Sequence, residues 1–416
     1  MDDRTSCAVV GGGPAGLVLG LLLARAGVQV TVLEKHADFL RDFRGDTVHP
    51  STMTLIDELG LWDAFATLPW KPIEKFRVIF DGGAATVADM SRLRQPHPFI
   101  AMVPQWHLLD LLAQTASRET CFTLRRHAEV VDLARSAGRT TGVHWRDQSG
   151  AEHELAADLV VACDGRDSRI RTLSGLPIHD FDVPMDVWWF RIPRVDAGDP
   201  SGGSARISAG RMVVMLDRGD YYQVAYLVPH GRVAEYRQRP ISSLQDDLRF
   251  LHPWLGDRVL GVASWDDVKP LSVSLNRLRR WSGPGVLCIG DAAHAMSPVG
   301  GVGINLAVQD AVAAARYLAP ALLDPTPAGV DAAADRVQRR RWWPTAITQG
   351  LQRVAHRGVI RAALGTSTAK GRGVRRVPLP LRLVDRFPLL QMLPARAIGV
   401  GALPEHAPAF ARPPRE

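Results

Sequence analysis

The chain has 416 residues, 46% of them hydrophobic and 22% charged, and a formal net charge of +7. This length exceeds the usual size of a single domain, and the composition is that of an ordinary globular protein with a large core. The basic residues are mostly arginine and are scattered along the chain, apart from 339–341 and 372–376. A nucleic-acid partner is not expected, because it requires basic residues gathered into one patch.

The four cysteines predict neither a disulfide framework nor a metal site. Cys7, Cys163 and Cys288 each lie in a short apolar run before a glycine turn, where cysteine acts as a small buried hydrophobe. The N-terminal sequence passes directly into a strand-like run, and no uncharged apolar run reaches the roughly 18 residues of a membrane span. We therefore expect a cytoplasmic protein with no signal peptide and no integral membrane segment.

A strand, a helix and a second strand are predicted at the N-terminus, over 6–10, 15–26 and 28–34. The turn that joins the first strand to the helix, 11–16, fits the pattern GxGxxG. In such a turn the first glycine permits the tight bend, the second lets the backbone reach a pyrophosphate, and the third lets the helix pack close to the strand. The alternative, a glycine-rich turn that binds no nucleotide, is disfavoured by this context.

Glu34 ends the second predicted strand, 18 positions beyond Gly16. An acidic residue at this place binds the hydroxyls of an adenosine ribose. Because a carboxylate replaces the basic pocket that a 2′-phosphate requires, the unit fits FAD or NAD and not NADP.

The chain then predicts a helix, a hairpin, a second helix, a β-meander and a further parallel strand, at 52–59, 76–90, 105–117, 128–146 and 159–163. Asp164 and Gly165 follow the last of these strands, and a carboxylate at a strand end followed by glycine suits close packing near a cofactor. Asp167 or Ser168 is also suited to cap a following helix, and both interpretations can hold together.

Aromatic and β-branched residues predict a separate sheet with strands at 186–193, 212–216 and 221–229, and 195–210 is predicted as a loop. One side of the strand at 188–193 should face a core and the other a cavity. A single strand does not show which side is which.

A buried strand at 286–289 is followed by Gly290-Asp291, a glycine-rich turn and a helix from about Asn305. The carboxylate, the glycines and the free N–H groups of the helix suit a planar, polyhydroxylated, anionic cofactor. His294 in this turn is interpreted as a packing residue.

The chain after Asp310 is predicted to be helical, with loops at 324–329 and 365–377. The segment 378–406 is amphipathic and interrupted by prolines. We interpret it as packing on the seam between the domains, with membrane contact or a lid over the substrate as alternatives.

The segments 11–16, 164–171 and 290–305 resemble, in order, the three fingerprints of the single-component FAD-dependent aromatic hydroxylases, the para-hydroxybenzoate hydroxylase-like class A flavoprotein monooxygenases. The resemblance covers most of residues 5–320. It implies an α/β fold with a Rossmann-like, glutathione reductase-type FAD domain, an inserted mostly antiparallel β-sheet domain for the substrate, and C-terminal helices. The expected boundaries are 1–75, 101–180 and 276–325 for the FAD domain, 76–100 and 181–275 for the substrate domain, and 326–416 for the C-terminal helical region.

The resemblance also implies which residues bind FAD. Arg44 would lie over the flavin, Gln105 would touch the flavin or the ribityl chain, Val130 would contact adenine through its backbone, and Asp291 would contact the ribityl chain. The complete expected set is Gly11, Gly13, Pro14, Ala15, Gly16, Glu34, Lys35, Arg44, Gln105, Val130, Asp164, Asp291, Pro298, Gly301, Gly303, Ile304 and Asn305. No catalytic side chain and no metal ligand is assigned, although Arg191, Tyr221 and Tyr222 are candidates for a base.

The implied activity is that of an FAD monooxygenase that uses NAD(P)H as a transient electron donor and O₂ as co-substrate. It would hydroxylate or epoxidise a bulky aromatic, polyketide-like or alkaloid-like small molecule through a C4a-(hydro)peroxyflavin. One alternative is a flavin oxidase or halogenase on the same fold, since 188–193 approaches the W-x-W-x-I-P of flavin halogenases, with Phe190 in place of the second tryptophan. Another is an FAD-binding protein without catalysis. The glycine-rich turn at 300–303 favours oxygenation.

Overall fold

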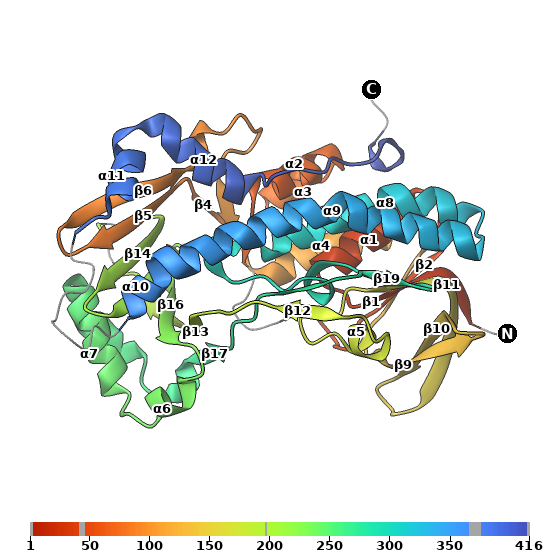
Figure 1. Ribbon diagram of the computed structural model, residues 1–416, viewed down its shortest axis with the longest axis horizontal. Helices are drawn as coiled ribbons and strands as arrows, with labels where there is room; N and C mark the ends of the chain where they lie inside the picture. Colours follow the sequence, from red (N-terminus) through yellow and green to blue (C-terminus); the bar gives the residue numbers. More distant parts are fainter. Residues whose placement is uncertain (1–2, 41–45, 196–197, 366–375, 414–416) are drawn as a thin grey trace.

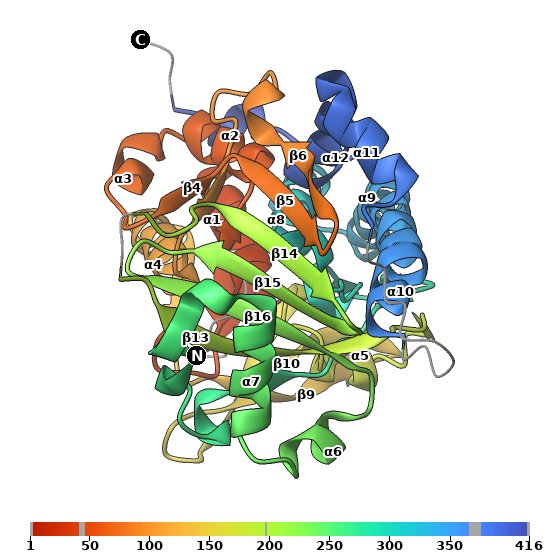
Figure 2. The same ribbon diagram turned by 90° about the vertical axis from the view of Figure 1, so that its left-hand side faces the viewer.

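The computed structural model describes residues 3–40, 46–195, 198–365 and 376–413. Two large β-sheets and a group of long helices make up this part of the chain (Figures 1 and 2). The predicted fold class is confirmed: a Rossmann-like α/β domain, an inserted and mostly antiparallel sheet, and C-terminal helices.

The first sheet is built on five parallel strands in the order β8-β2-β1-β11-β20. They are β1 (Arg4–Val10), β2 (Val30–Leu33), β8 (Phe122–Arg125), β11 (Glu152–Ala162) and β20 (Val286–Cys288). Most of their residues are apolar and buried, as in parallel sheets covered on both faces. The predicted meander is present as β9 (Glu129–Ser136) and β10 (Arg139–Arg146): β9 pairs with β10, and β10 pairs with the first half of β11. Strand β19 (Ser282–Gly283) adds an edge strand.

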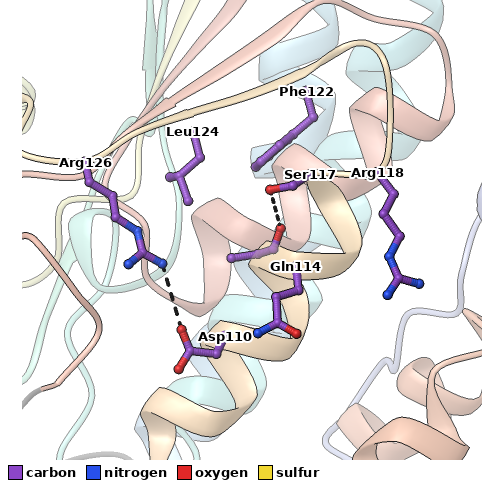
Figure 3. Close-up of a pocket in the computed structure, with 8 residues that line it drawn as sticks. Asp110, Gln114, Ser117, Arg118, Phe122, Leu124 and Arg126 are labelled. Carbon is purple, nitrogen blue, oxygen red and sulfur yellow. Dashed lines mark hydrogen bonds and ion pairs between the residues drawn. The ribbon is translucent and has the colours of Figure 1, made fainter.

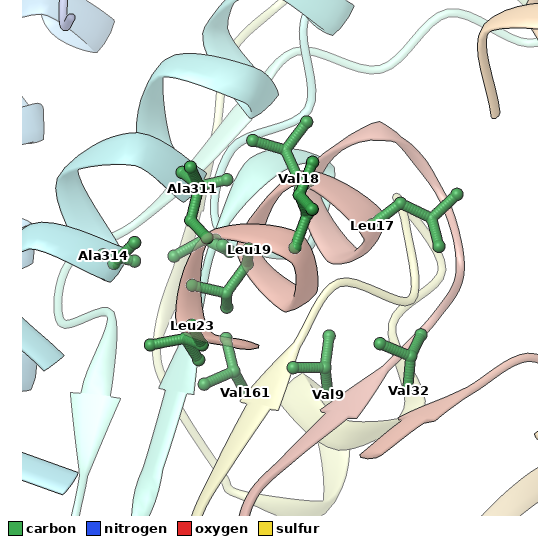
Figure 4. Close-up of a cluster of buried hydrophobic side chains, with 14 of the residues drawn as sticks. Val9, Leu17, Val18, Leu19, Leu23, Val32, Val161, Ala311 and Ala314 are labelled. Atoms are coloured by element: carbon green, nitrogen blue, oxygen red, sulfur yellow. The ribbon is translucent and has the colours of Figure 1, made fainter. Parts of the chain in front are cut away.

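Helices α1 (Pro14–Arg25), α4 (Gln105–Ala116) and α8 (Gly303–Leu323) pack together over the parallel strands. Leu19 of α1 lies above Val9 and Val161, and the small side chains of Ala311 and Ala314 let α8 lie close against α1 (Figure 4). Among the described helices, only α8 with the turn before it is long and apolar enough to cross a membrane, and 72% of that window is buried inside the protein. Its apolar residues belong to the core.

The second sheet has the order β17-β13-β16-β15-β14-β5-β6 and is antiparallel except where β14 pairs with β5. Its strands are β5 (Lys75–Phe80), β6 (Gly83–Asp89), β13 (Met185–Pro193), β14 (Gly203–Ser208), β15 (Arg211–Asp217), β16 (Tyr221–Pro229) and β17 (Lys269–Leu271). The predicted hairpin at 76–90 is confirmed as β5 and β6. The prediction of a loop throughout 195–210 is wrong, because Ala205 and Ile207 are buried on one side of β14.

The two sides of β13 now have different neighbours. Trp188, Phe190 and Ile192 belong to a core covered by α7 (Ser242–Leu251) and the turns at 253–261. Val187 and Trp189 belong to a second cluster on the opposite side of the sheet. The ambiguity that the sequence left at this strand is thereby resolved.

The remaining elements connect the sheets or cover them. The short strands are β3 (Thr47–Val48), β4 (Lys71–Ile73), β7 (Ile100–Met102), β12 (Ile178–Asp180) and β18 (Asn276–Leu278). The remaining helices are α2 (Pro50–Glu58), α3 (Trp62–Ala66), α5 (Arg169–Leu173), α6 (Val233–Arg237), α9 (Pro327–Ala355), α10 (Arg361–Leu364), α11 (Leu379–Arg386) and α12 (Pro388–Gly399), with one π-helical turn at His356–Ile360. The predicted loop at 365–377 lies almost entirely outside the described residues.

Candidate functional site

The three fingerprints meet at one edge of the parallel sheet. Neighbouring strands β1, β11 and β20 end at Val10, Ala162 and Cys288, and each continues into one of the fingerprints. Carboxyl ends of adjacent parallel strands form the usual ligand-binding edge of such sheets. Side-chain contacts join the segments as well, since Arg171 donates a hydrogen bond to the carbonyl of Ala292 at 3.2 Å.

The first turn requires its glycines for steric reasons. A Cβ atom at Gly11 would lie 2.5 Å from the carbonyl oxygen of Cys163, and one at Gly16 would lie 1.9 Å from that of Gly11. At Gly13, by contrast, a Cβ would meet nothing within 4 Å, so the space beside it is open. Helix α1 begins here with Pro14 and without a side-chain cap, so the N–H groups of its first turn are available to an anion.

Glu34 lies at the end of β2 and is directed at this turn. Its Oε2 accepts a hydrogen bond from the N–H of Gly12 at 2.9 Å, and the residue is 7% exposed. The N–H of Ala128 donates to the Glu34 carbonyl, which places the segment leading to Val130 on β9 beside the same strand end. Lys35 follows and is exposed.

Asp164 contributes an incompletely satisfied carboxylate at the end of β11. Its Oδ2 accepts from the N–H of Ile170, whereas its buried Oδ1 has no hydrogen-bond partner among the described residues. Burial raises the pKa of this carboxyl above its usual value. Gly165 follows with φ +85° and open space where a Cβ would be, and Ser168 caps α5 as one of the two predicted caps.

Asp291 and the turn after it form the third part of the site. The Asp291 carboxylate lies 3.9 Å from the Arg166 guanidinium and about a third of its side chain is exposed. Burial raises the pKa of Asp291, and Arg166 and His294 oppose that rise. Gly300 and Gly301 have φ of +82° and +64°, so the turn that follows Pro298 depends on glycine at both positions.

The turn is held from behind by residues whose role the sequence left unassigned. His49 lies between two carbonyls, with Nε2 2.9 Å from that of Gly301 and Nδ1 3.0 Å from that of Ile398 in α12. Burial lowers the pKa of His49 to about 4, so the ring is neutral at neutral pH. Thr47 donates a second hydrogen bond to the Gly301 carbonyl.

The start of α8 is fixed in the same way. Asn305 is buried, and its Oδ1 accepts hydrogen bonds from Ser51 at 2.6 Å and from Thr52 at 2.9 Å. Ile304 and Gly303, which precede it, open the helix against the glycine turn. Helix α2 therefore sets the position of this third fingerprint.

Gln105 lies at the boundary between the two sheets. Its N–H donates to the Asp46 carboxylate, which also pairs with Arg218 of the β15–β16 turn at 3.4 Å. Both charged side chains are almost completely buried. The ion pair joins the loop before β3 to the second sheet, and neither residue was predicted to do this. Arg44 lies outside the described residues.

His294 belongs to a buried network behind Asp291. Its Nε2 lies 2.5 Å from Asp310, which also accepts hydrogen bonds from Arg341 and from the N–H of Gly290. Arg341 continues to the Leu403 carbonyl. This arrangement agrees with the interpretation of His294 as a packing residue.

The second cluster of the inserted sheet faces this turn. Val187 and Ala225 of that sheet pack in one group with Met296 and Val302 of the third fingerprint, and Trp189 lies against the same group. The indole Nε1 of Trp189 is buried without a hydrogen-bond partner among the described residues. These residues form an apolar wall between the inserted sheet and the third fingerprint, and Trp189 supplies one unpaired donor on it.

The three residues considered as candidate bases, Arg191, Tyr221 and Tyr222, have different surroundings in the second sheet. Tyr222 is on the α7 side of the sheet and donates to the carbonyl of Pro200, so it does not face the apolar wall. Arg191 lies over the ring of Tyr221 at 4.5 Å.

An open groove of about 730 Å³ is found elsewhere, between α4 and β8 (Figure 3). Asp110, Arg118 and Arg126 are among its lining residues, and none of the predicted FAD-binding residues is. The groove is separate from the edge where the fingerprints meet.

The residues at the sheet edge fit FAD. Open space beside Gly13 and Gly165, an uncapped helix N-terminus and an unpartnered carboxylate oxygen at Asp164 provide room, donors and an acceptor for such a group.

Comparison with known proteins agrees with this geometry. The model of the FAD binding domain family matches residues 4–343. A 6-methylpretetramide 4-monooxygenase from Streptomyces rimosus is 34% identical over 317 residues, which are 75% of this chain and 74% of that protein. A 12-dehydrotetracycline 5-monooxygenase/anhydrotetracycline 6-monooxygenase from Streptomyces rimosus subsp. rimosus is 29% identical over 325 residues, 74% of this chain and 61% of that one.

Among solved structures, PqsL of Pseudomonas aeruginosa in complex with 2-aminobenzoylacetate superposes with a TM-score of 0.73 at 19% identity, over 87% of this chain and 97% of that chain. At this identity the likeness concerns the fold, whereas the family match extends over most of the sequence. The chain therefore belongs to the family of single-component FAD-dependent aromatic hydroxylases, and its cofactor is FAD.

Proposed function

We propose that the protein is an NAD(P)H-dependent monooxygenase that hydroxylates a bulky, polyketide-like aromatic molecule. The observation that carries the proposal is the apolar wall of β13 and β16, packed against the glycine turn of the third fingerprint. The similarity to a 6-methylpretetramide 4-monooxygenase supports a substrate of this class. Epoxidation is the alternative reaction for an alkene substrate.

The residues proposed to hold FAD divide by the part of the molecule they serve. The N–H groups after Gly13 would bind the pyrophosphate, Glu34 the adenosine ribose and Val130 the adenine. Asp291 would bind the ribityl chain, and the backbone at Gly301 and Gly303 would approach the flavin ring. The other residues of the proposed set are Gly11, Pro14, Ala15, Gly16, Lys35, Arg44, Gln105, Asp164, Pro298, Ile304 and Asn305. Bound FAD supplies the redox chemistry, accepting electrons from NAD(P)H and activating O₂.

The remaining tasks fall to side chains of this chain. The apolar wall would orient the substrate ring and keep water from it, which limits loss of reducing equivalents. His49 and Thr47 hold the Gly301 carbonyl from behind and keep the glycine turn in place. The helix α8 begins at the turn and stabilises negative charge there.

The proposed reaction is tested with the purified yellow protein. We expect NAD(P)H oxidation to accelerate when a polycyclic aromatic substrate is added, and the product to gain one oxygen atom from ¹⁸O₂. Bound flavin that never consumes NAD(P)H or O₂ would show a non-catalytic FAD protein. Incorporation of halide would show a halogenase, and oxidation of the substrate with release of peroxide in the absence of NAD(P)H would show an oxidase.

Trp189→Phe tests the substrate wall. Because the orphaned Nε1 would lose its chance of a hydrogen bond to the substrate, we expect KM to rise roughly 2- to 10-fold with FAD content unchanged. The matched control is Trp188→Phe on the opposite side of β13, where the ring packs on Tyr226 and Trp265. That control should lower the denaturation midpoint and leave KM unchanged, and the reverse pattern would contradict the assignment of the two sides.

We also propose that the FAD domain comprises 1–75, 101–180 and 276–325, the substrate domain 76–100 and 181–275, and the helical region 326–416. A cytoplasmic location is proposed on the same basis, since the chemistry needs a pool of NAD(P)H.

A further inference from the structure

The second half of helix α9 has its polar and apolar sides reversed relative to an ordinary surface helix. Apart from Pro344, its buried residues are polar, and they are Arg341, Thr345, Thr348, Gln349 and Gln352, followed by His356 of the π-helical turn. Its large exposed residues in the same stretch are apolar: Trp343, Ile347, Leu351 and Val354. Their spacing of four, four and three residues places them along one stripe of the helix.

The buried polar side is explained by the site. Gln352 donates to the carbonyls of Ser297 and Val299 and accepts from the N–H of Ser297, and Gln349 donates to the carbonyl of Asn276. His356 pairs with the hydroxyl of Ser297 at 2.9 Å. These contacts hold β18 and the turn of the third fingerprint. They leave the apolar stripe on the outside, where nothing in the described chain covers it.

Helices α11 and α12 add to the same surface. Both views place them with α9 on one side of the molecule (Figures 1 and 2). Their large exposed apolar residues are Leu379, Leu383, Phe387, Leu389, Leu390, Met392 and Leu393. Trp343 is 63% exposed and Leu389 75%. Large apolar side chains exposed together on one side of a soluble protein mark an interaction surface.

The charged residues around this apolar surface indicate which kind of partner binds it. Residues 336–365 and 376–402 contain eleven arginines and only one acidic residue, Asp385. The net charge of the whole chain is +7, so this region is more positive than the protein as a whole. Of the eleven, eight form no ion pair among the described residues: Arg336, Arg339, Arg353, Arg357, Arg376, Arg382, Arg386 and Arg396.

A second copy of the chain would bring two such positive regions together, and like charges across an interface oppose association. A membrane surface with anionic headgroups offers an apolar region for the exposed side chains and negative charge for the arginines. Apolar side chains enter the boundary between headgroups and acyl chains, a tryptophan sits at headgroup level, and the arginines pair with the lipid phosphates.

We propose that the surface formed by α9, α11 and α12 binds peripherally to an anionic lipid bilayer. The contact is that of helices lying on the membrane, and no part of the chain crosses it. This inference stands apart from the proposed reaction, because it concerns the outer side of α9 and requires no particular substrate.

The test uses the FAD-loaded full chain and sedimented vesicles. We expect it to bind vesicles of phosphatidylcholine with about one third phosphatidylglycerol at low ionic strength, and not vesicles of pure phosphatidylcholine. Salt at about 1 M should release it, because charges are then screened beyond roughly 3 Å. Arg382→Gln with Arg386→Gln should weaken partition about 30-fold.

The apolar contribution is tested by Trp343→Ser with Leu351→Ser, which should lower partition at least as much without changing flavin absorbance. Phe250→Ser on α7 and Arg118→Gln beside α4 are the controls, being an exposed apolar and an exposed basic residue on other surfaces, and both should bind as the unaltered protein does. Absence of binding at low salt, or unchanged binding by the Trp343/Leu351 variant, would overturn the proposal. So would a dimer in light scattering that this variant converts to a monomer while vesicle binding stays the same.

Discussion

We expect Arg341→Met to lower the free energy of unfolding by about 3–5 kcal/mol, because it removes one partner of a buried ion pair. Arg341 is 1% exposed and donates to Asp310 at 3.0 Å and to the Leu403 carbonyl at 3.0 Å. Asp310 in turn accepts from the N–H of Gly290, next to Asp291. The substitution should therefore also reduce FAD content. Urea denaturation followed by circular dichroism, and flavin absorbance after gel filtration, measure the two effects.

Arg340→Met is the matched control for this substitution. Arg340 pairs with Glu405 at 2.6 Å, and a third of its side chain is exposed. Glu405 is buried but keeps Arg316 as a partner at 2.6 Å, so the loss of Arg340 should lower the free energy of unfolding by less than the loss of Arg341 does. Equal midpoints for the two variants would contradict the importance of the buried pair.

The buried Asp310–Arg341 pair also predicts that the unaltered protein and Arg341→Met differ in how their stability depends on pH in acid. Burial by itself raises the pKa of Asp310, but His294 and Arg341 outweigh this effect and hold that pKa below its usual value. The stabilisation is then complete above the carboxyl pKa of the unfolded chain, about 4, and is lost as the pH falls below it. The unaltered protein should lose stability in acid more steeply than Arg341→Met.

Gly16→Ala is expected to abolish FAD binding. A Cβ at this position would lie 1.9 Å from the Gly11 carbonyl oxygen, and neither backbone segment can move without opening the first turn. Flavin retained after gel filtration, together with the thermal midpoint of the apoprotein, measures the result. Full flavin content in this variant would show that the turn does not bind FAD.

Gly13→Ala and Asp291→Ala separate loss of FAD from loss of the fold. A Cβ at Gly13 meets no protein atom within 4 Å, so the apoprotein should be as stable as before while FAD affinity falls at least tenfold. Asp291→Ala should likewise lower FAD occupancy without unfolding the chain. Gly350→Ala in α9 is the control, since it has equally open surroundings and is part of no fingerprint.

The strands, turns and helices that carry the fingerprints could be predicted from the sequence. Each fingerprint is a strand end, a turn and the start of a helix, and its steric requirements are met by residues close together in the chain. Gly16 illustrates this, because its nearest obstacle is the carbonyl of Gly11, five positions earlier, whereas the obstacle at Gly11 is the carbonyl of Cys163 on a neighbouring strand. Strand β14 was missed, because its glycine and serine residues favour a loop unless β5 is present to pair with it.

The residues that hold the site from behind could not be predicted, because their partners lie far away in the sequence. His49 contacts carbonyls 252 and 349 positions away in the sequence, and no local sequence pattern predicts partners at such a distance. Asp46 and Arg218 form their buried ion pair across the two sheets, so its existence depends on how the sheets are placed.

The sequence by itself determined a dinucleotide-binding turn and the order of the three fingerprints, because these depend on local geometry and on the chemistry of a few side chains. The resemblance that the fingerprints carry implied FAD and the fold class. Only the tertiary structure decided which side of β13 faces the site and that α9 turns its polar side inward. Burial is a property of what packs against a surface, and a helix or strand with two dissimilar sides does not specify its neighbours. The polar side of α9 is buried because the turn at 295–299 offers backbone groups that need partners, and the apolar stripe is left outside as a consequence.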